Sequence, residues 1–300
     1  MEDENPEVRT EAVTLLRALT RAHFGFAVFD FEEKQQAAIK RWRNALDSGS
    51  ISTAESLQLG VRRSNLPLGH TLLAHGYRGG VKELDPTGQV VWDFSIKGAW
   101  AAERLRNGNT LVASYSERRI MEVDTEGEEV WSFKTPNLNA RELWNGNILV
   151  AAYSDQRIIE VDRKQNEVVW EFAAQNSVHD AVAVGKDRIL FVWKQGVREI
   201  KRSGEIVWEW IGTEDQSKLY GVQRLDNGNT LIADYGLGRV VEVARNKEVV
   251  WEIAVSRPSD AFRLPNGNTL ITTSREHIEV TPQKEKVWIW PGARSGSARR

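Results

Sequence analysis

The 300-residue sequence contains no cysteine, which excludes disulfides, thiolate metal sites and cysteine nucleophiles. It has no excess of basic residues either, since the formal net charge is −2 and the isoelectric point is about 6.3. It also lacks any run of about 18 apolar residues, the length that a membrane-spanning helix needs. We therefore expect neither nucleic acid nor a membrane as a partner, and we expect packing to stabilise the fold.

Several signatures of catalysis and export are absent too. The sequence has no G-x-S-x-G, P-loop, dinucleotide-binding or H-E-x-x-H motif. Its histidines share no short ligand spacing, so no metal site and no cofactor is predicted. The acidic N-terminus, Met1 to Pro6, lacks the apolar core of a signal peptide, so we expect a cytoplasmic chain unless a preceding segment exports it.

Tryptophan is abundant, with twelve residues in the chain, and six of them recur with a period. The spacings are 39, 39, 38, 43 and 37 residues between Trp92, Trp131, Trp170, Trp208, Trp251 and Trp288. A period near 40 residues is typical of a protein built from repeated structural units. A second large apolar residue stands two positions after each tryptophan, as Phe94 follows Trp92, which places both side chains on one face of a strand.

Each repeat contains the signals of two hairpins. A glutamate nine or ten residues before each tryptophan marks a further strand, and the six are Glu83, Glu122, Glu160, Glu199, Glu242 and Glu279. A turn segment such as Asp124-Thr-Glu-Gly127 separates this strand from the tryptophan strand. Earlier in most repeats stands Leu-x-Asn-Gly-Asn-Thr-Leu, as in residues 105–111, where Asn-Gly predicts a type I′ turn with positive φ at both central residues. Each unit therefore has four strands, A to D.

Antiparallel four-stranded units repeated at this period predict an all-β fold, a six-bladed β-propeller. Val61 to Ala74 aligns without a gap on Ser259 to Thr272, so the first unit is expected to contain its own strand A. The last unit ends with strand D at Trp290. We therefore predict a propeller over residues 58–290 and a flexible tail over residues 291–300.

Residues 1–57 have a different, helical period. Asn5 to Leu19 carries apolar residues at positions 8, 12, 15, 16 and 19, a helical stripe. A second helix is predicted from Glu32 to Leu46, and the Ser/Gly-rich residues 48–52 form a linker. This helical hairpin is too small to fold alone, so we expect it to be an accessory to a larger body.

The repeat resembles the pyrroloquinoline-quinone-like (PQQ-like) propeller repeat, in which a D-x-x-x-G-x-x-x-W tryptophan docking run ends each blade. Asp85 to Trp92 is one residue shorter than that run, and Asp162 to Trp170 has its length but not its glycine. Residues 264–271, Leu-Pro-Asn-Gly-Asn-Thr-Leu-Ile, are similar to repeats of bacterial arylsulfotransferase-like propellers and of planctomycete-type propellers. Asn5 to Leu19 resembles the second part of a HEAT repeat, which implies a HEAT-like remnant before the propeller.

The two faces of such a propeller differ in sequence. The A–B and C–D turns of one face are stereotyped, whereas the B–C loops and D–A connections of the other face vary, and variable loops on a rigid scaffold commonly bind ligands. This variable face, the mouth of the central channel, combines the starts of the A strands with three Tyr-x-x-x-Arg loops. The predicted binding residues are Trp100, Tyr115, Arg119, Tyr153, Arg157, His179, Asp180, Tyr220, Tyr235, Arg239 and Asp260. They suit a protein loop or a small anionic or aromatic ligand.

Other interpretations of these residues stay open. In Tyr-x-x-x-Arg, the arginine can pack over the ring or pair with a neighbouring strand, as a device that only holds the loop. The strand-C glutamates are expected to be structural, because every repeat has one and a single active site needs only one. We predict a monomeric, non-catalytic binding or scaffold propeller. The alternative is an arylsulfotransferase-like enzyme, for which the resemblance implies a nucleophilic histidine, His179 beside Asp180, with cationic partners.

Overall fold

The computed structural model describes residues 12, 32–48, 69–76, 79–212, 217–292 and 296–300. The chain divides into two compact units, residues 1–69 and residues 70–300. The predicted helix Asn5–Leu19, with its HEAT-like pattern, lies outside the described residues except for residue 12.

In the first unit, helix α2 spans Glu32–Asp47 and agrees with the predicted helix Glu32–Leu46 to within one residue. Its buried side chains are Ala38, Ile39, Trp42 and Ala45, spaced by three and four residues as in an amphipathic helix. Trp42 is 1% exposed and is the largest of them. Among the described residues, no helix combines the length and the hydropathy that crossing a bilayer requires.

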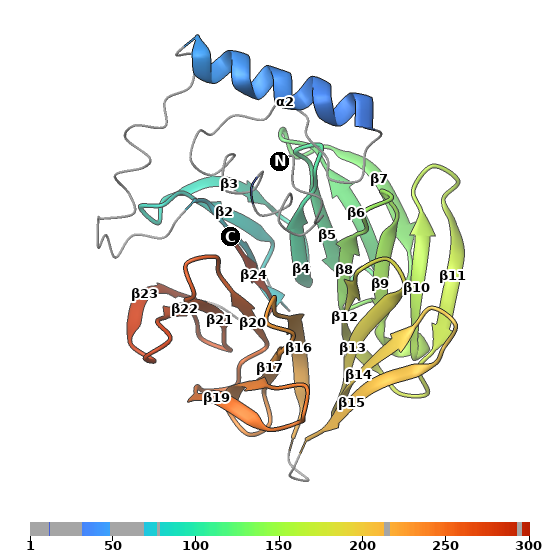
Figure 1. Cartoon of the computed structure of the whole chain (residues 1–300), viewed down its shortest axis with the longest axis vertical. Helices are drawn as coiled ribbons and strands as arrows, with labels where there is room; N and C mark the ends of the chain where they lie inside the picture. Colours follow the sequence, from blue (N-terminus) through green and yellow to red (C-terminus); the bar gives the residue numbers. More distant parts are fainter. Residues whose placement is uncertain (1–11, 13–31, 49–68, 77–78, 213–216, 293–295) are drawn as a thin grey trace. The chain divides into compact units, whose positions relative to one another are not determined.

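The second unit is a β-propeller of six four-stranded antiparallel blades, as the tryptophan period predicts (Figure 1). From the innermost to the outermost strand, blade 1 consists of β24 (Ala298–Arg299), β1 (Thr71–Ala74), β2 (Val81–Leu84) and β3 (Val90–Phe94). Blade 2 consists of β4 (Ala99–Arg104), β5 (Thr110–Ser114), β6 (Arg119–Val123) and β7 (Glu129–Lys134), and blade 3 of β8 (Asn139–Glu142), β9 (Ile148–Ala152), β10 (Arg157–Asp162) and β11 (Glu167–Ala173). Blade 4 consists of β12 (Val178–Val184), β13 (Arg188–Trp193), β14 (Gly196–Lys201) and β15 (Ile206–Ile211). Blade 5 consists of β16 (Leu219–Arg224), β17 (Thr230–Asp234), β18 (Arg239–Val243) and β19 (Val249–Ala254), and blade 6 of β20 (Asp260–Arg263), β21 (Thr269–Thr272), β22 (Glu276–Val280) and β23 (Lys286–Pro291).

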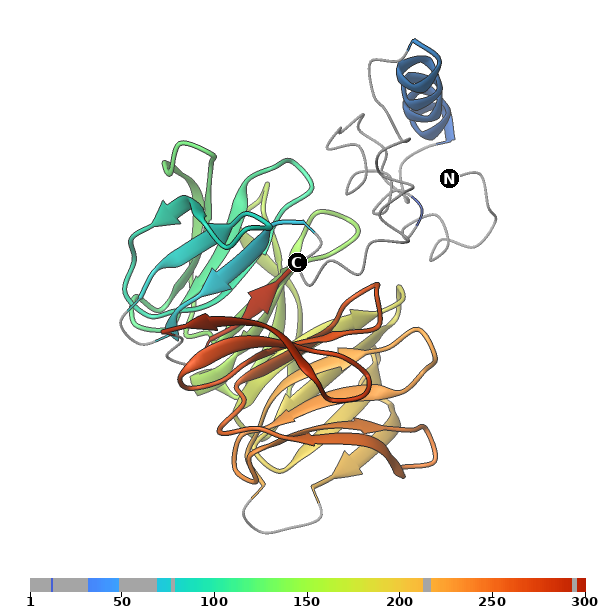
Figure 2. The same cartoon turned by 90° about the vertical axis from the view of Figure 1, so that its left-hand side faces the viewer.

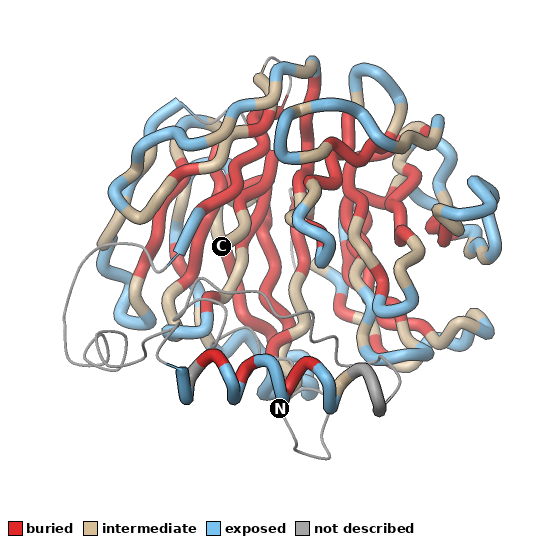
Figure 3. The backbone as a smooth tube through the Cα atoms, turned by 90° about the horizontal axis from the view of Figure 1, so that it is seen from above, coloured by how far each residue is buried: buried red, intermediate tan, exposed pale blue. Residues whose placement is uncertain are grey.

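The hydrophobic core lies between neighbouring blades. The six inner strands surround the central channel, and each contacts the inner strand of the next blade (Figure 1). The second strands are buried on both faces, as in β5 and β9, where all five residues of each are buried. The outermost strands begin with exposed valines such as Val91 and Val130, so burial decreases outward along each blade (Figure 3).

The A–B turns differ from the predicted type I′ geometry. In blade 2, the amide of Gly108 donates to the carbonyl of Leu105, and Gly108 has φ +94° whereas Asn107 is not in the positive-φ region. This is a type I turn followed by a glycine in the left-handed region, the three-residue hairpin loop. The side chains of Asn107 and Asn109 both donate to the carboxylate of Glu122, at 2.7 Å each. The asparagines are therefore selected as partners of the strand-C glutamate as well as for the turn.

Each strand-C glutamate also binds an arginine of the following blade. Arg104 pairs with Glu83 at 2.6 Å, and Arg263 pairs with Glu242 at 2.9 Å. The same arginines cover the strand-D tryptophans Trp92 and Trp251 at 5.3 and 5.1 Å from the ring centroids. Repeated glutamate, arginine and tryptophan side chains thus join neighbouring blades, which accounts for the glutamates without a catalytic role.

The inner strand of blade 1 differs from two predictions. It is β24, from the C-terminal end of the chain, and it pairs with β1 through Leu73 opposite Ala298 (Figure 2). Residues 297–300 therefore belong to the propeller, and the prediction of a flexible tail over residues 291–300 is wrong. The predicted strand A near Val61 lies outside the described residues, and the structure fills its place with β24. Blade 1 therefore combines the last strand of the propeller, β24, with its first three strands. The pairing of β24 with β1 closes the ring.

Candidate functional site

Six of the predicted binding residues form one cluster at the mouth of the channel. Trp100, His179 and Tyr220 stand at the starts of the inner strands β4, β12 and β16. The other three follow the second strands of their blades, and one of them begins the short 3₁₀ helix η3 (Tyr153–Asp155). We call the set the aromatic cluster, and its members are Trp100, Tyr115, Tyr153, His179, Tyr220 and Tyr235.

The aromatic cluster crosses the channel axis. Trp100 of blade 2 stacks on Tyr220 of blade 5, with ring centroids 6.1 Å apart, and these two blades face each other across a six-membered ring. Tyr115 contacts Tyr153 at 6.2 Å, and Tyr220 contacts Tyr235 at 5.1 Å. Trp100 is buried, whereas the four tyrosines are half-buried. The cluster therefore spans the channel from blade 2 to blade 5 and presents half-buried tyrosine rings at the mouth.

His179 lies at the centre of the aromatic cluster. Its ring stacks on Tyr153 at 5.1 Å and on Tyr220 at 4.4 Å, both nearly parallel. Its Nδ1 lies 2.5 Å from the carbonyl oxygen of Leu219, so Nδ1 carries the proton and donates. Burial lowers the pKa of His179 to about 4, with a smaller contribution from the positive charge of Lys194, whereas the Leu219 carbonyl opposes the shift. The imidazole is therefore neutral at pH 7, and its Nε2 can only accept a hydrogen bond.

The three arginines of the Tyr-x-x-x-Arg loops do not join the aromatic cluster. Arg119 pairs with Glu129 at 2.6 Å, and Arg157 pairs with Glu171 at 3.0 Å. Arg239 likewise pairs with Glu252 at 3.1 Å. All three carboxylates belong to the outermost strands, so the guanidinium groups lie along the blade sheets and away from the channel. The pattern Tyr-x-x-x-Arg places the tyrosine at the channel and uses the arginine to hold the loop on its sheet.

Asp180 and Asp260 lie deeper in the channel. Both oxygens of Asp180 accept from Arg141 of the preceding blade, at 3.1 and 2.9 Å. Asp260 pairs with Arg299 of β24. Glu103 of blade 2 lies in the field of both arginines. We call Glu103, Arg141, Asp180, Asp260 and Arg299 the charged layer.

A cavity of about 260 Å³ adjoins the charged layer. Its wall contains one residue from the same position of each inner strand, namely Glu103, Arg141, Val182, Gln223, Phe262 and Arg299. Most of the remaining lining, namely Glu142, Leu143, Ala183 and Arg224, lies toward the A–B ends of these strands, and Val222 stands one residue before Gln223. The cavity is therefore on the opposite side of the charged layer from the aromatic cluster.

Sequence reasoning missed Glu103, Arg141 and Arg299. The signal for the first two was the column of residues two positions after Ala101 and Asn139 in strand A, where charged residues stand at a position that faces the channel. Arg299 could have been found by aligning Ser297-Ala-Arg-Arg300 with Asp260-Ala-Phe-Arg263.

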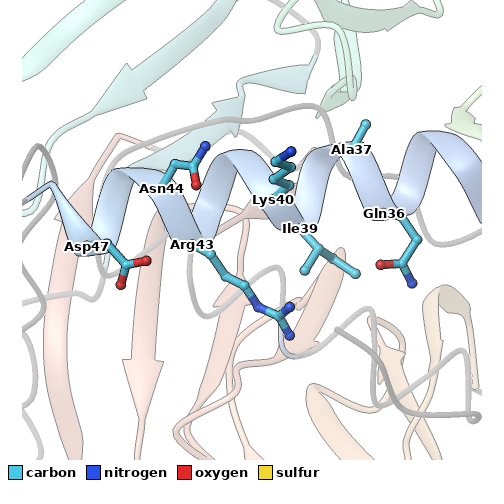
Figure 4. A pocket seen from close by; sticks show the side chains of 7 residues that line it. All are labelled: Gln36, Ala37, Ile39, Lys40, Arg43, Asn44 and Asp47. Atoms are coloured by element: carbon cyan, nitrogen blue, oxygen red, sulfur yellow. The ribbon is translucent and has the colours of Figure 1, made fainter.

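A second hollow, of about 480 Å³, lies on helix α2 (Figure 4). The lining residues are Gln36, Ala37, Ile39, Lys40, Arg43, Asn44 and Asp47. These side chains are mostly polar and contain no histidine. In the described residues of both units, no group of three or more histidine, aspartate or glutamate side chains is arranged to hold a metal ion.

Fold and channel together define a six-bladed β-propeller of the PQQ-like class. The family model described as outer membrane protein assembly factor BamB matches residues 77–164 and 117–297, and the chain belongs to that family. No curated protein matches the sequence.

Solved structures of several other proteins share this fold. A protein of unknown function from Bacteroides caccae is 19% identical, with a TM-score of 0.62, over 74% of this chain and 93% of that chain. Virginiamycin B lyase from Staphylococcus aureus is 12% identical, with a TM-score of 0.54, over 71% of this chain and 76% of that chain. A streptogramin B lyase is 12% identical, with a TM-score of 0.56, over 76% and 80%. At these identities the likeness concerns the fold alone.

Proposed function

We propose that this chain is a non-catalytic binding propeller that recognises an aromatic, anionic group at the channel mouth, presented by a protein loop or by a small ligand. The observation that carries the proposal is the aromatic cluster, in which four half-buried tyrosine rings are held on blades 2, 3 and 5. Exposed Tyr faces bind planar groups by stacking and offer hydroxyls to polar ones. The description of the family as an assembly factor supports a binding or scaffold role.

Charge around the mouth favours an anionic partner. Lys97, Lys194 and Lys218 are exposed on the D–A and B–C connections of this face. The carboxylates of the neighbouring loops, Glu117 and Asp155, are engaged by Arg119 and Arg157 at 2.7 and 3.2 Å. The three lysines therefore favour an anionic ring system over a cationic one.

The alternative, an arylsulfotransferase-like enzyme, rests on His179. A nucleophilic imidazole needs a free nitrogen with access to the substrate and cationic groups around the transferred sulfuryl group. In the described part of the chain, His179 bonds the carbonyl of Leu219, stacks on two tyrosines and has no arginine or lysine in hydrogen-bond contact. These contacts favour a structural role at the centre of the binding surface.

A thermal-shift screen with aryl sulfates, quinones and their uncharged phenol analogues tests the proposal. We expect stabilisation by an anionic aromatic compound, lost in the variants Tyr153→Ala and Tyr235→Ala and retained in the control Asn227→Ala on the opposite face. Sulfate release from 4-nitrophenyl sulfate is measured in parallel. Turnover that disappears in a folded His179→Ala variant would establish the enzyme instead, and absence of any shift with the whole panel would count against a small ligand and direct the search to peptides.

A further inference from the structure

Charges alternate around the charged layer in the order of the blades. The sequence runs from Asp260 in blade 6 through Arg299, Glu103 and Arg141 to Asp180 in blade 4. Blade 5 contributes uncharged residues at these positions, Gly221 and Gln223. With every group ionised, the layer holds three carboxylates and two guanidinium groups and therefore lacks one positive charge.

Within the described part of the chain, Glu103 is the carboxylate of the charged layer that has no ion pair of its own. Arg141 is engaged with both oxygens of Asp180, and Arg299 is engaged with Asp260. Among the described contacts, the carboxylate of Glu103 receives one hydrogen bond, from the backbone amide of Glu142 at 3.2 Å. Burial raises the pKa of Glu103, although the charges of Arg141 and Arg299 and the Glu142 amide oppose the shift. Glu103 is half-buried, and a partly desolvated carboxylate without its own cation is costly, so a ligand cation would relieve that cost.

The wall opposite Glu103 is partly apolar, and Gln223 and Arg224 of blade 5 supply its polar part, with Arg224 paired to Glu199. Val182 and Ala183 of blade 4, together with Val222 of blade 5, line the same cavity. A cation that fits this cavity therefore carries an alkyl stem for the apolar wall and a terminal donor group for the carboxylate. The volume of about 260 Å³ accommodates a single side chain or a small amine.

We propose that the cavity at the A–B end of the channel binds an alkyl ammonium or alkyl guanidinium group, with Glu103 as its counter-ion and Val182, Ala183 and Val222 against its stem. This site lies on the other side of the charged layer from the aromatic cluster, so it is independent of the function proposed above. The cation can belong to a free diamine or to a lysine or arginine side chain of a protein segment.

Isothermal titration calorimetry at pH 8 tests the site with two probes, agmatine as a free guanidinium compound and an acetylated, amidated peptide with a single central lysine. We expect at least one probe to bind wild-type protein, and the identity of that probe distinguishes a free ligand from a protein segment. Glu103→Gln should weaken binding about tenfold or more, the loss expected from one charge-assisted hydrogen bond. The matched control Glu117→Gln, in the same blade at the mouth, should retain the wild-type affinity.

Two further variants keep the test independent of folding and of the aromatic cluster. Val182→Phe fills the cavity without changing any charge and should abolish binding, whereas Tyr235→Ala at the mouth should leave it unchanged. Binding should also release protons near and below the raised pKa of Glu103, in a layer where Arg141, Arg299 and Glu142 are the charged neighbours. Failure of both probes to bind, or equal affinity in wild type and Glu103→Gln, would overturn the proposal.

Discussion

Trp100 and Tyr220 stack across the channel, 6.1 Å apart between ring centroids and with their planes at 29°, although they belong to opposite blades. We expect this contact to couple the two halves of the ring. In a double-mutant cycle, Trp100→Ala and Tyr220→Ala should show an interaction free energy of about 0.5–1.5 kcal/mol, the range for aromatic pairs. Urea unfolding measures it.

The matched control for this cycle combines Trp100→Ala with Ile289→Ala, an exposed residue on the outermost strand of blade 6. Distant sites usually add within about 0.3–0.5 kcal/mol. Additivity of the Trp100 and Tyr220 variants to the same degree would mean that the rings do not support each other.

Glu199 has the most arginines around it of the strand-C glutamates in the described residues. It is fully buried and binds Arg188 at 2.7 Å, Arg224 at 2.5 Å and also Arg245 of the next blade. Glu199→Gln should lower the free energy of unfolding by about 3 kcal/mol, because the substitution removes a fully buried anion and leaves the largely buried Arg224 guanidinium without its counter-ion.

The control for Glu199 is Glu209→Gln, whose carboxylate is 34% exposed and pairs with Arg198. A half-exposed pair contributes about 0–1 kcal/mol, so this variant should unfold at nearly the wild-type urea concentration. Similar midpoints for the two variants would show that Glu199 does not hold blades 4 and 5 together.

Ring closure depends on the last four residues of the sequence. The amide of Ala74 donates to the carbonyl of Ser297 at 2.9 Å, and Arg300 pairs with the buried Glu279 and lies 5.3 Å from the ring centroid of Trp288. Deleting residues 297–300 should lower the thermal unfolding midpoint and broaden the transition, because blade 1 loses its inner strand. Differential scanning calorimetry measures both effects.

A single substitution tests the ion pair between Arg300 and Glu279 without deleting strand β24. Arg300→Ala should cost about 3 kcal/mol or more, since Glu279 is only 3% exposed and loses its cation. Lys286→Ala, at a surface pair with Glu276, should cost less than about 1 kcal/mol. An unchanged midpoint in the deletion variant would mean that another segment can close the ring.

The sequence predicts the blades well because their signals are local. A tryptophan strand, a glutamate strand and an Asn-Gly turn each follow from a few adjacent residues, and six copies reinforce one another. Ring closure is non-local: Ser297 to Arg300 form too short a segment to show a strand period, and their likeness to Asp260 to Arg263 emerges only by comparison with another blade.

The candidate site likewise has residues that the sequence could place and residues that it could not. Positions such as His179 and Tyr220 could be assigned to the channel because they share one place in the repeat. The direction of Arg119 could not, since a long side chain at the start of strand C reaches either the mouth or the carboxylate of Glu129 on strand D. The ion pair with Glu129 holds the side chain against its own blade.

Acid should destabilise the propeller through buried histidines, of which His277 is the clearest. It is fully buried, its Nδ1 lies 3.0 Å from the hydroxyl of Thr272, and its ring meets His75 at 5.5 Å between centroids. Burial first, and the charge of His75 second, lower the pKa of His277 from 6.5 to about 3. Between these values the unfolded chain binds a proton that the folded chain does not, so stability is fully present above about pH 6.5 and falls as the pH falls.

We therefore expect the free energy of unfolding of wild-type protein to decrease from pH 7 to pH 4, with His277 contributing up to about 1.4 kcal/mol per pH unit. His277→Asn removes the titrating group, so its stability should depend less steeply on pH whatever its absolute value. Asn137→Ala, which removes a buried side-chain hydrogen bond to the Thr135 carbonyl but no titrating group, should lower stability equally at all three pH values, 7, 5.5 and 4. Urea unfolding at pH 7, 5.5 and 4 distinguishes these outcomes, and parallel pH profiles for wild type and His277→Asn would show that His277 is not the acid-sensitive group.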